Sequence, residues 1–228
     1  MQYPATILII CGIVHEMNKI IKEIENRKII PVVTVQNVTQ GLHIMQALVE
    51  GGLPAAEITF RTEAAAEAIR VMCQKYPNAL IGAGTILNIT QAKEAEEAGA
   101  KFLVSPGYSD EVVSYCIEKN IAVFPGCMTP TDILRALAAG LSTVKFFPAE
   151  PAGGLRLLKA LSEPFPKLRF MPTGGISKDN LMEYLNFPKV VACGGSWITK
   201  PAKENDFAAV RQEAENAVKL VCRWKEQG

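Results

Sequence analysis

The run TVKFFPAE, residues 143–150, decides how the rest of the chain is interpreted. Its hydrophobic and aromatic residues are typical of a buried β-strand, except for one lysine, whose charge is costly to bury without a partner. Successive strand residues point to opposite faces. Lys145 therefore shares a face with Phe147, whereas Val144 and Phe146 share the other face. Which face turns inward depends on the architecture around this strand.

The flanking sequence repeats one pattern, in which a short run of strand-forming residues is followed by a predicted helix. The predicted strands cover residues 29–35, 55–60, 79–84, 101–105, 121–126, 143–147, 168–175 and 189–195. The predicted helices that follow them cover residues 39–50, 62–75, 90–98, 109–119, 130–139, 154–162, 177–186 and 206–224. Alternating strands and helices predict a parallel sheet, and eight such units in this length favour a closed (β/α)8 TIM barrel in a single domain.

Two local signals refine this prediction. Thr129 is expected to cap a helix that opens with Pro130, because proline is tolerated at the first helical position. Gly82-Ala83-Gly84 lacks the GxGxxG spacing of a dinucleotide-binding fold. The sequence thus favours the barrel over an open, doubly wound sheet.

The beginning of the chain departs from the pattern. Residues 1–16 contain an apolar run that is too short to span a bilayer and lacks the basic segment of a signal peptide. From Met17 an apolar residue recurs at helical spacing, so a short N-terminal helix is expected to precede the first strand. We expect an extension over residues 1–16 and a barrel domain over residues 17–228; the alternative is that the extension makes a packing or oligomer contact.

Composition excludes several classes of function. The formal net charge of +1 gives no electrostatic footprint for nucleic acid or for a membrane surface. None of the six cysteines forms a CxxC pair, so they are interpreted as reduced thiols of a cytoplasmic protein. His15 and His43 are the two histidines, too few for a metal site built on histidines, and no metal is expected.

Function is expected at the carboxyl ends of the barrel strands. Apolar helices cover the outside of a barrel, which assigns Val144 and Phe146 to the outer face and Lys145 to the interior. Burial disfavours the charged form of a lysine, and a neutral amine attacks ketones to form a Schiff base. The alternative is a lysine paired with a carboxylate for a structural purpose.

By the same alternation, Glu57 points inward from residues 55–60 and becomes a candidate partner for Lys145. A carboxylate there could move the protons that imine chemistry requires, or it could form a buried ion pair without catalysis. Arg61 follows at the end of the same strand, where its planar fork could bind a substrate carboxylate. Its alternative is a solvated loop arginine.

A glycine pair ends each of the last two predicted strands. Gly174-Gly175 ends one, and Gly194-Gly195, followed by Ser196, ends the other. Loops at these positions of a barrel commonly bind phosphate through backbone N–H groups, although glycine pairs also make simple tight turns. The combined groups suit a substrate with a ketone beside a carboxylate at one end and a phosphate at the other.

Several motifs together resemble one known family. The segments EITFRTEAA, GAGTILN, SPG, TVKFFPAE, PTGGIS and GGSW are similar to those of the 2-keto-3-deoxy-6-phosphogluconate (KDPG) aldolases, a family that includes the bifunctional 4-hydroxy-2-oxoglutarate aldolases. The resemblance extends from about Met17 to the C-terminus. It implies a class I aldolase that uses neither a metal nor a cofactor. It also implies that the enzyme forms homotrimers. It also implies cleavage of KDPG to pyruvate and glyceraldehyde 3-phosphate, with 4-hydroxy-2-oxoglutarate as a further substrate.

The resemblance also implies a role for each matching residue. Lys145 would form the Schiff base and Glu57 would be the general acid and base. The implied substrate-binding residues are Arg61 and Thr85 for the pyruvate carboxylate, Pro106 and Phe147 around the reacting carbons, and Gly174, Gly175 and Ser196 for the phosphate.

Two other functions remain open at this level. One is an isomerase or synthase that uses the same phosphate site with Lys145 as an electrostatic group only. The other is a binding protein that has lost catalysis, against which the presence of both Lys145 and Glu57 argues. The sequence does not identify the preferred substrate among the gluconate compound, its galactonate isomer and hydroxy-oxoglutarate.

Overall fold

The computed structural model describes residues 19–227, so the predicted extension over residues 1–16 lies outside the described part. A helical segment over residues 19–27 precedes the first strand. The strands are β1 (Ile29–Val33), β2 (Ala55–Thr59), β3 (Leu80–Gly84), β4 (Phe102–Val104), β5 (Ala122–Phe124), β6 (Thr143–Phe146), β7 (Arg169–Pro172) and β8 (Cys193–Gly195). The helices are α2 (Val38–Glu50), α3 (Ala65–Lys75), α4 (Ile89–Glu97), α5 (Asp110–Glu118), α6 (Pro130–Ala138), α7 (Gly154–Ser162), α8 (Leu181–Leu185), the 3-10 helix η1 (Lys200–Glu204) and α9 (Phe207–Gln227).

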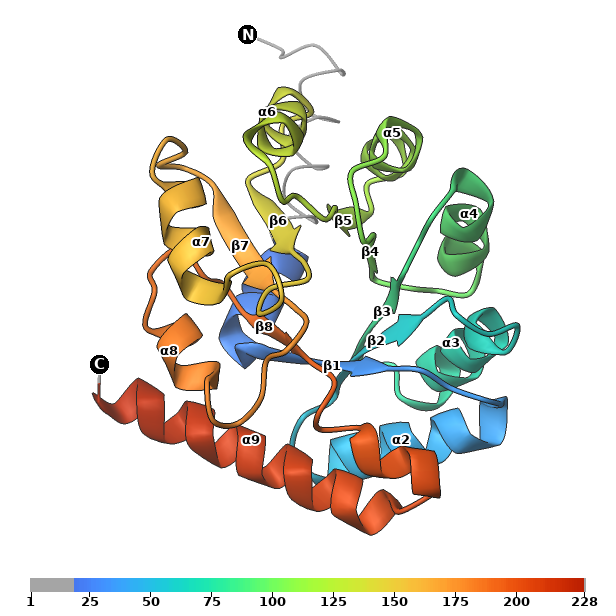
Figure 1. Cartoon of the computed structure of the whole chain (residues 1–228). Helices are drawn as coiled ribbons and strands as arrows, with labels where there is room; N and C mark the ends of the chain where they lie inside the picture. The colour runs from blue at the N-terminus through green and yellow to red at the C-terminus, as the bar shows by residue number, and fades with distance from the viewer. Residues whose placement is uncertain (1–18, 228) are drawn as a thin grey trace, which may run out of the picture.

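The strands form a closed parallel barrel with the helices outside it (Figure 1). Six strands pair continuously in the order β5-β4-β3-β2-β1-β8, and β6 pairs with β7. Two connections close the circle. The Lys145 N–H donates to Pro125 O at 2.9 Å, and the Phe170 N–H donates to Lys189 O at 2.8 Å. The predicted (β/α)8 barrel is confirmed.

Much of the barrel interior is apolar. Inward-facing residues of the strands, including Leu80, Phe102 and Met171, form one buried apolar cluster. Ile24 of the segment over residues 19–27 packs into that cluster and closes this end. The amino-terminal end of the barrel is thus filled, which leaves the carboxyl end for polar side chains.

A second apolar layer lies between the strands and the surrounding helices. Val144 and Phe146 belong to it, as does Ile58. The predicted alternation of β2 and β6 is therefore confirmed, because the neighbouring residues Glu57 and Lys145 face the barrel interior.

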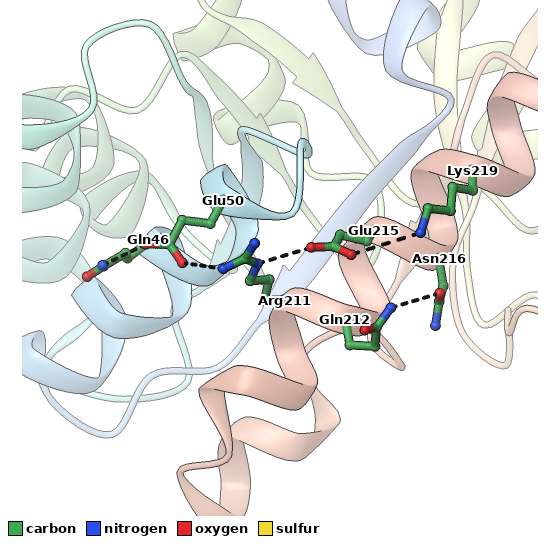
Figure 2. Close-up of polar contacts among 7 residues, drawn as sticks. All are labelled: Gln46, Glu50, Arg211, Gln212, Glu215, Asn216 and Lys219. Atoms are coloured by element: carbon green, nitrogen blue, oxygen red, sulfur yellow. Dashed lines mark hydrogen bonds and ion pairs between the residues drawn. The ribbon is translucent and has the colours of Figure 1, made fainter.

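The long helix α9 packs across α2 on the outside of the barrel (Figure 1). Gly51, at the end of α2, allows close approach, since a Cβ there would lie 2.6 Å from the Cβ of Ala214. Figure 2 shows the polar contacts at this junction, where Arg211 pairs with Glu50 at 3.5 Å and with Glu215 at 3.0 Å. Exposed ion pairs of this kind contribute about 1 kcal/mol or less, so close apolar packing is the main contact between the two helices.

The differences from the predicted elements are at their ends. The strand predicted over residues 168–175 ends at Pro172, and the helix predicted over residues 177–186 is shortened to Leu181–Leu185. The 3-10 helix η1 has no counterpart in the prediction. The cap at Thr129 is confirmed, because its side chain accepts the Asp132 N–H and Pro130 begins α6. Among the described helices, none has the length and apolar character needed to cross a membrane.

Candidate active site

Lys145 and Glu57 meet inside the barrel near the carboxyl ends of its strands. They come from β6 and β2, which lie on opposite sides of the closed circle, so both inward side chains reach toward the axis. Lys145 Nζ donates to Glu57 Oε1 at 3.2 Å. Lys145 is 5% exposed and Glu57 is 1% exposed. Two opposite charges are thus held together away from water, next to the upper end of the apolar interior.

These two residues line a cavity of about 220 Å³. The cavity is lined by Val32, Glu57, Thr59, Arg61, Thr85, Pro106, Lys145, Phe147, Thr173, Gly174 and Ser196. All residues predicted for the site except Gly175 therefore line this cavity. The structure brings together side chains from most of the strand ends, although their roles in binding and catalysis stay predictions.

The position of Glu57 depends on a glycine of the neighbouring strand. Gly84 on β3 lies beside Glu57, and a Cβ there would approach Glu57 Oε1 to 2.2 Å. A similar relation holds for Thr173, since a Cβ on Gly194 would approach its Oγ1 to 2.3 Å. Glycine at these two places makes room for polar side chains to turn into the barrel.

Two further residues have geometry that bears on ligand binding. Thr85 has a φ of +57°, in the left-handed region that β-branched residues rarely adopt. Such backbone strain persists where the surroundings hold it, often at functional sites. The Phe147 ring centroid lies 5.1 Å from Lys145 Nζ, so this aromatic ring covers one side of the ammonium group.

Gly174 and Gly175 have different positions relative to the cavity. Gly174 lines it, with a φ of +98° and the Phe147 ring 3.3 Å from where its Cβ would be. Gly175 is packed against Glu150 instead, since its Cβ would lie 2.5 Å from the Glu150 Cβ. The Tyr184 hydroxyl donates to Glu150, and burial together with this hydrogen bond raises the pKa of Tyr184. These contacts fix the turn that follows β7.

Sequence reasoning missed three residues of the cavity wall: Val32, Thr59 and Thr173. Thr59 shares the inward face of Glu57, so strand alternation alone could have identified it. The Thr59 hydroxyl lies 2.8 Å from that of Thr34 on the preceding strand's extension. Thr173 lies within the strand predicted over residues 168–175, and no local signal in the sequence distinguishes its hydroxyl as part of a site.

The site retains unused hydrogen-bonding capacity. Glu57 Oε2 and Thr173 Oγ1 are buried and make no hydrogen bond with any described residue. Buried polar atoms normally have partners, so these two oxygens are suited to bind a polar ligand. Within residues 19–227, no group of three or more His, Cys, Asp and Glu side chains is arranged to hold a metal ion. The arrangement provides an amine, a carboxylate beside it, and polar walls for a small anionic carbonyl compound.

Comparison with known proteins agrees with this chemistry. The family model described as KDPG and KHG aldolase matches residues 20–213. The chain is 43% identical to the 2-dehydro-3-deoxy-phosphogluconate aldolase of Treponema pallidum over 208 residues, which cover 90% of this chain and 99% of the relative.

Two solved structures show the same fold. The KDPG aldolase of Zymomonas mobilis ZM4 with 3-phosphoglycerate has a TM-score of 0.83 and 36% identity, and the match covers 90% of this chain and 95% of that one. The KDPG aldolase of Legionella pneumophila, with pyruvate captured as a covalent carbinolamine, has a TM-score of 0.80 and 35% identity, and the match covers 83% and 93% of the two chains. On its fold, its buried lysine and these similarities, the chain belongs to the KDPG and KHG aldolase family.

Proposed function

We propose that this chain cleaves KDPG to pyruvate and glyceraldehyde 3-phosphate through an imine formed on Lys145. The observation that carries the proposal is the buried pair of Lys145 and Glu57, 3.2 Å apart in the wall of one cavity. A lysine in that setting can act as a nucleophile once its proton passes to the adjacent carboxylate. The covalent pyruvate captured in the Legionella pneumophila aldolase supports the same chemistry.

The first half of the proposed reaction forms the imine. The neutral amine of Lys145 attacks the C2 ketone of the substrate, and the C2 oxygen takes up a proton to give a carbinolamine. Glu57 then supplies a proton to the departing hydroxyl, which leaves as water. The product of this half is a protonated imine that links Lys145 to C2. Its positive charge makes it an electron sink for the next step.

The second half breaks the carbon–carbon bond. Glu57, now a carboxylate, accepts the proton of the C4 hydroxyl, and the C3–C4 electrons move into the imine to give an enamine. Glyceraldehyde 3-phosphate leaves with C4 as its aldehyde carbon. Protonation of the enamine at C3 and addition of water at C2 then release pyruvate and restore the amine of Lys145. No redox cofactor is needed, because the overall cleavage involves no net oxidation or reduction.

The remaining cavity residues would bind the substrate. Arg61 and Thr85 are proposed to hold the carboxylate, and Pro106 and Phe147 to enclose the reacting carbons. Gly174, Gly175 and Ser196 are proposed to bind the phosphate. For Gly175 this role would fall to its backbone, since the place of a side chain is taken by Glu150.

Trapping with borohydride tests the proposal directly. Incubation of the protein with pyruvate and borohydride should reduce the imine and leave a stable pyruvyl adduct on Lys145, detected by peptide mass spectrometry. The Lys145→Met variant should gain no mass under the same conditions. An unmodified wild-type protein, or an adduct that persists in the variant, would overturn the imine mechanism. It would favour an isomerase or synthase instead.

We propose 4-hydroxy-2-oxoglutarate (2-keto-4-hydroxyglutarate, KHG) as a second substrate, because the family includes KHG aldolases. Cleavage of 4-hydroxy-2-oxoglutarate to pyruvate and glyoxylate uses the same bond-breaking step and the same Lys145 and Glu57. Measuring kcat/KM for the two substrates side by side, with the galactonate isomer included, identifies the preferred one.

We also propose that the chain assembles as a homotrimer, as its resemblance to the family implies. Light scattering should give a mass near three times 24.8 kDa. The mass of a single chain would contradict the trimer and would leave the proposed reaction unaffected.

A further inference from the structure

The turn after β7 has a backbone shape that its own residues do not enforce. Gly174 and Gly175 both lie in the left-handed region, with φ of +98° and +83°. Glycine enters this region readily, but it also populates many other conformations at little cost. A turn of two successive glycines therefore needs contacts from outside to select one shape. The structure provides such contacts on three side chains, each from a neighbouring element.

Two of these contacts fix the directions of the peptide units. The Glu150 N–H donates to Gly174 O at 3.0 Å. Asn180 donates through Nδ2 to Gly175 O at 3.1 Å. In a trans peptide unit, the C=O and the N–H of the following residue point in opposite directions. Since both oxygens are turned toward protein donors, the N–H groups of Gly175 and Ile176 point away from those donors. Within residues 19–227, neither N–H makes a hydrogen bond, so both are available to an anion.

The side chain of Asn180 is itself held in one orientation. Its Oδ1 accepts the Ser177 N–H at 2.9 Å, which leaves Nδ2 directed at Gly175 O. Asn180 directly precedes α8, so the turn is tied to the start of that helix. The amide therefore links the helix to the second peptide unit of the turn.

The third contact holds Glu150 against the turn. Tyr184 of α8 is 1% exposed, and its hydroxyl donates to Glu150 Oε1. A buried hydroxyl normally has a partner, so this bond restrains a glutamate that is otherwise exposed. The restrained side chain lies against the turn, since a Cβ on Gly175 would be 2.5 Å from Glu150 Cβ. Glu150 thus stands between the buried hydroxyl and the backbone of the turn.

From these contacts we infer that Glu150, Tyr184 and Asn180 are positioning residues that hold the turn after β7 in the form that binds the substrate phosphate. None of the three lines the cavity of Lys145, so each acts through the turn and not on the reacting carbons. The inference rests on the proposed function, which assigns the phosphate to this turn. It adds the side chains that give the turn its shape.

A matched pair of substrates tests the inference, namely KDPG and 2-keto-3-deoxygluconate, which lacks only the phosphate. Tyr184→Phe and Asn180→Ala each remove one contact that supports the turn. In each variant kcat/KM for KDPG should fall about two- to tenfold through KM, the range that one hydrogen bond is worth. For 2-keto-3-deoxygluconate kcat/KM should stay within about twofold, because the weakened contact is to the phosphate alone. An unchanged preference for the phosphorylated substrate in both variants would overturn the inference.

Two substitutions of Glu150 separate its hydrogen bond from its charge. Glu150→Gln and Glu150→Ala both remove the negative charge, but only glutamine keeps an oxygen that can accept the Tyr184 hydroxyl. The KM for KDPG should therefore be at least about twofold higher in Glu150→Ala than in Glu150→Gln. The same KM in the two variants would show that the hydrogen bond does not shape the site.

Tyr115 provides a control with the same chemistry at a distant place. Its buried hydroxyl on α5 donates to Glu96 of α4, and neither residue lines the cavity. Tyr115→Phe should lower Tm about as much as Tyr184→Phe does, because each loses one hydrogen bond between a phenol and a carboxylate. Its KM for KDPG should match that of the wild type. An equal rise in KM in the two phenylalanine variants would reduce the effect to general destabilisation and refute the positioning role.

Trapping distinguishes this inference from the proposed function. Pyruvate carries no phosphate, so Tyr184→Phe and Asn180→Ala should form the borohydride-reduced adduct on Lys145 at the wild-type level. Normal adducts together with an unchanged preference for phosphate would refute the positioning role only. If the wild-type protein forms no adduct, the proposed function and this inference both fail.

Discussion

Replacing Lys145 with methionine should lower kcat/KM for KDPG by about 10⁴-fold or more, since loss of a catalytic nucleophile has effects of that order or larger. The side chain of Met has a similar length and fits an apolar surrounding, but it cannot attack a ketone. Lys145→Arg should lose activity to the same extent, because it keeps a positive charge beside Glu57 and lacks a nucleophilic amine. A coupled assay for pyruvate release measures both variants.

The two variants should differ in stability. Lys145→Met leaves the buried Glu57 without its partner, and breaking a buried pair typically costs about 3–5 kcal/mol. Lys145→Arg keeps a counter-charge, so its Tm should stay closer to that of the wild type. Retention of more than a tenth of the activity in Lys145→Arg would show that Lys145 acts through its charge, as it would in the isomerase or synthase alternative.

The central pair of the site could be predicted from the sequence because strand alternation is a local rule. Val144 and Phe146 fit only the apolar layer beneath the helices, which left the interior for Lys145. The same rule placed Glu57 inward on β2. That the two side chains meet followed from the closed barrel, in which β2 and β6 lie on opposite sides.

The rest of the site depends on contacts that no local rule describes. Thr173 turns into the cavity because Gly194, on the neighbouring strand, leaves space for its side chain. Gly175, predicted beside Gly174, packs against Glu150 because the turn after β7 is held from its other side by Tyr184. Pairings of this kind depend on strand register and loop packing, which the sequence alone does not specify.

The 3-10 helix η1 illustrates the same limit. Its residues, which include Pro201, lie between the last predicted strand and the last predicted helix, where the sequence predicts only a connection. The hydrogen bond from Gln40 to Ala202 O, across 162 positions of the chain, helps to hold that helix where it is.

Glu57→Gln should lower kcat for KDPG by about 10²–10⁴-fold, the usual contribution of a general acid or base. Glutamine has nearly the same shape, so it fits beside Gly84 and the fold should be retained. The amide cannot transfer protons, and the amine of Lys145 remains in place. The pyruvyl adduct on Lys145 should therefore still form with borohydride, but more slowly. This separates Glu57→Gln from Lys145→Met, in which no adduct forms.

A change on the neighbouring strand tests the same role without altering Glu57. In Gly84→Ala the new Cβ would overlap Glu57 Oε1, at 2.2 Å, so the carboxylate must move and kcat should fall toward the value of Glu57→Gln. Gly82→Ala is its control, because a Cβ there meets the Phe102 ring at 2.4 Å in the apolar half of the barrel. Both variants should lose stability, but only Gly84→Ala should lose turnover per folded molecule. Equal turnover in the two alanine variants would mean that the position of the Glu57 carboxylate does not limit the reaction, and proton transfer would then have to be assigned to another group.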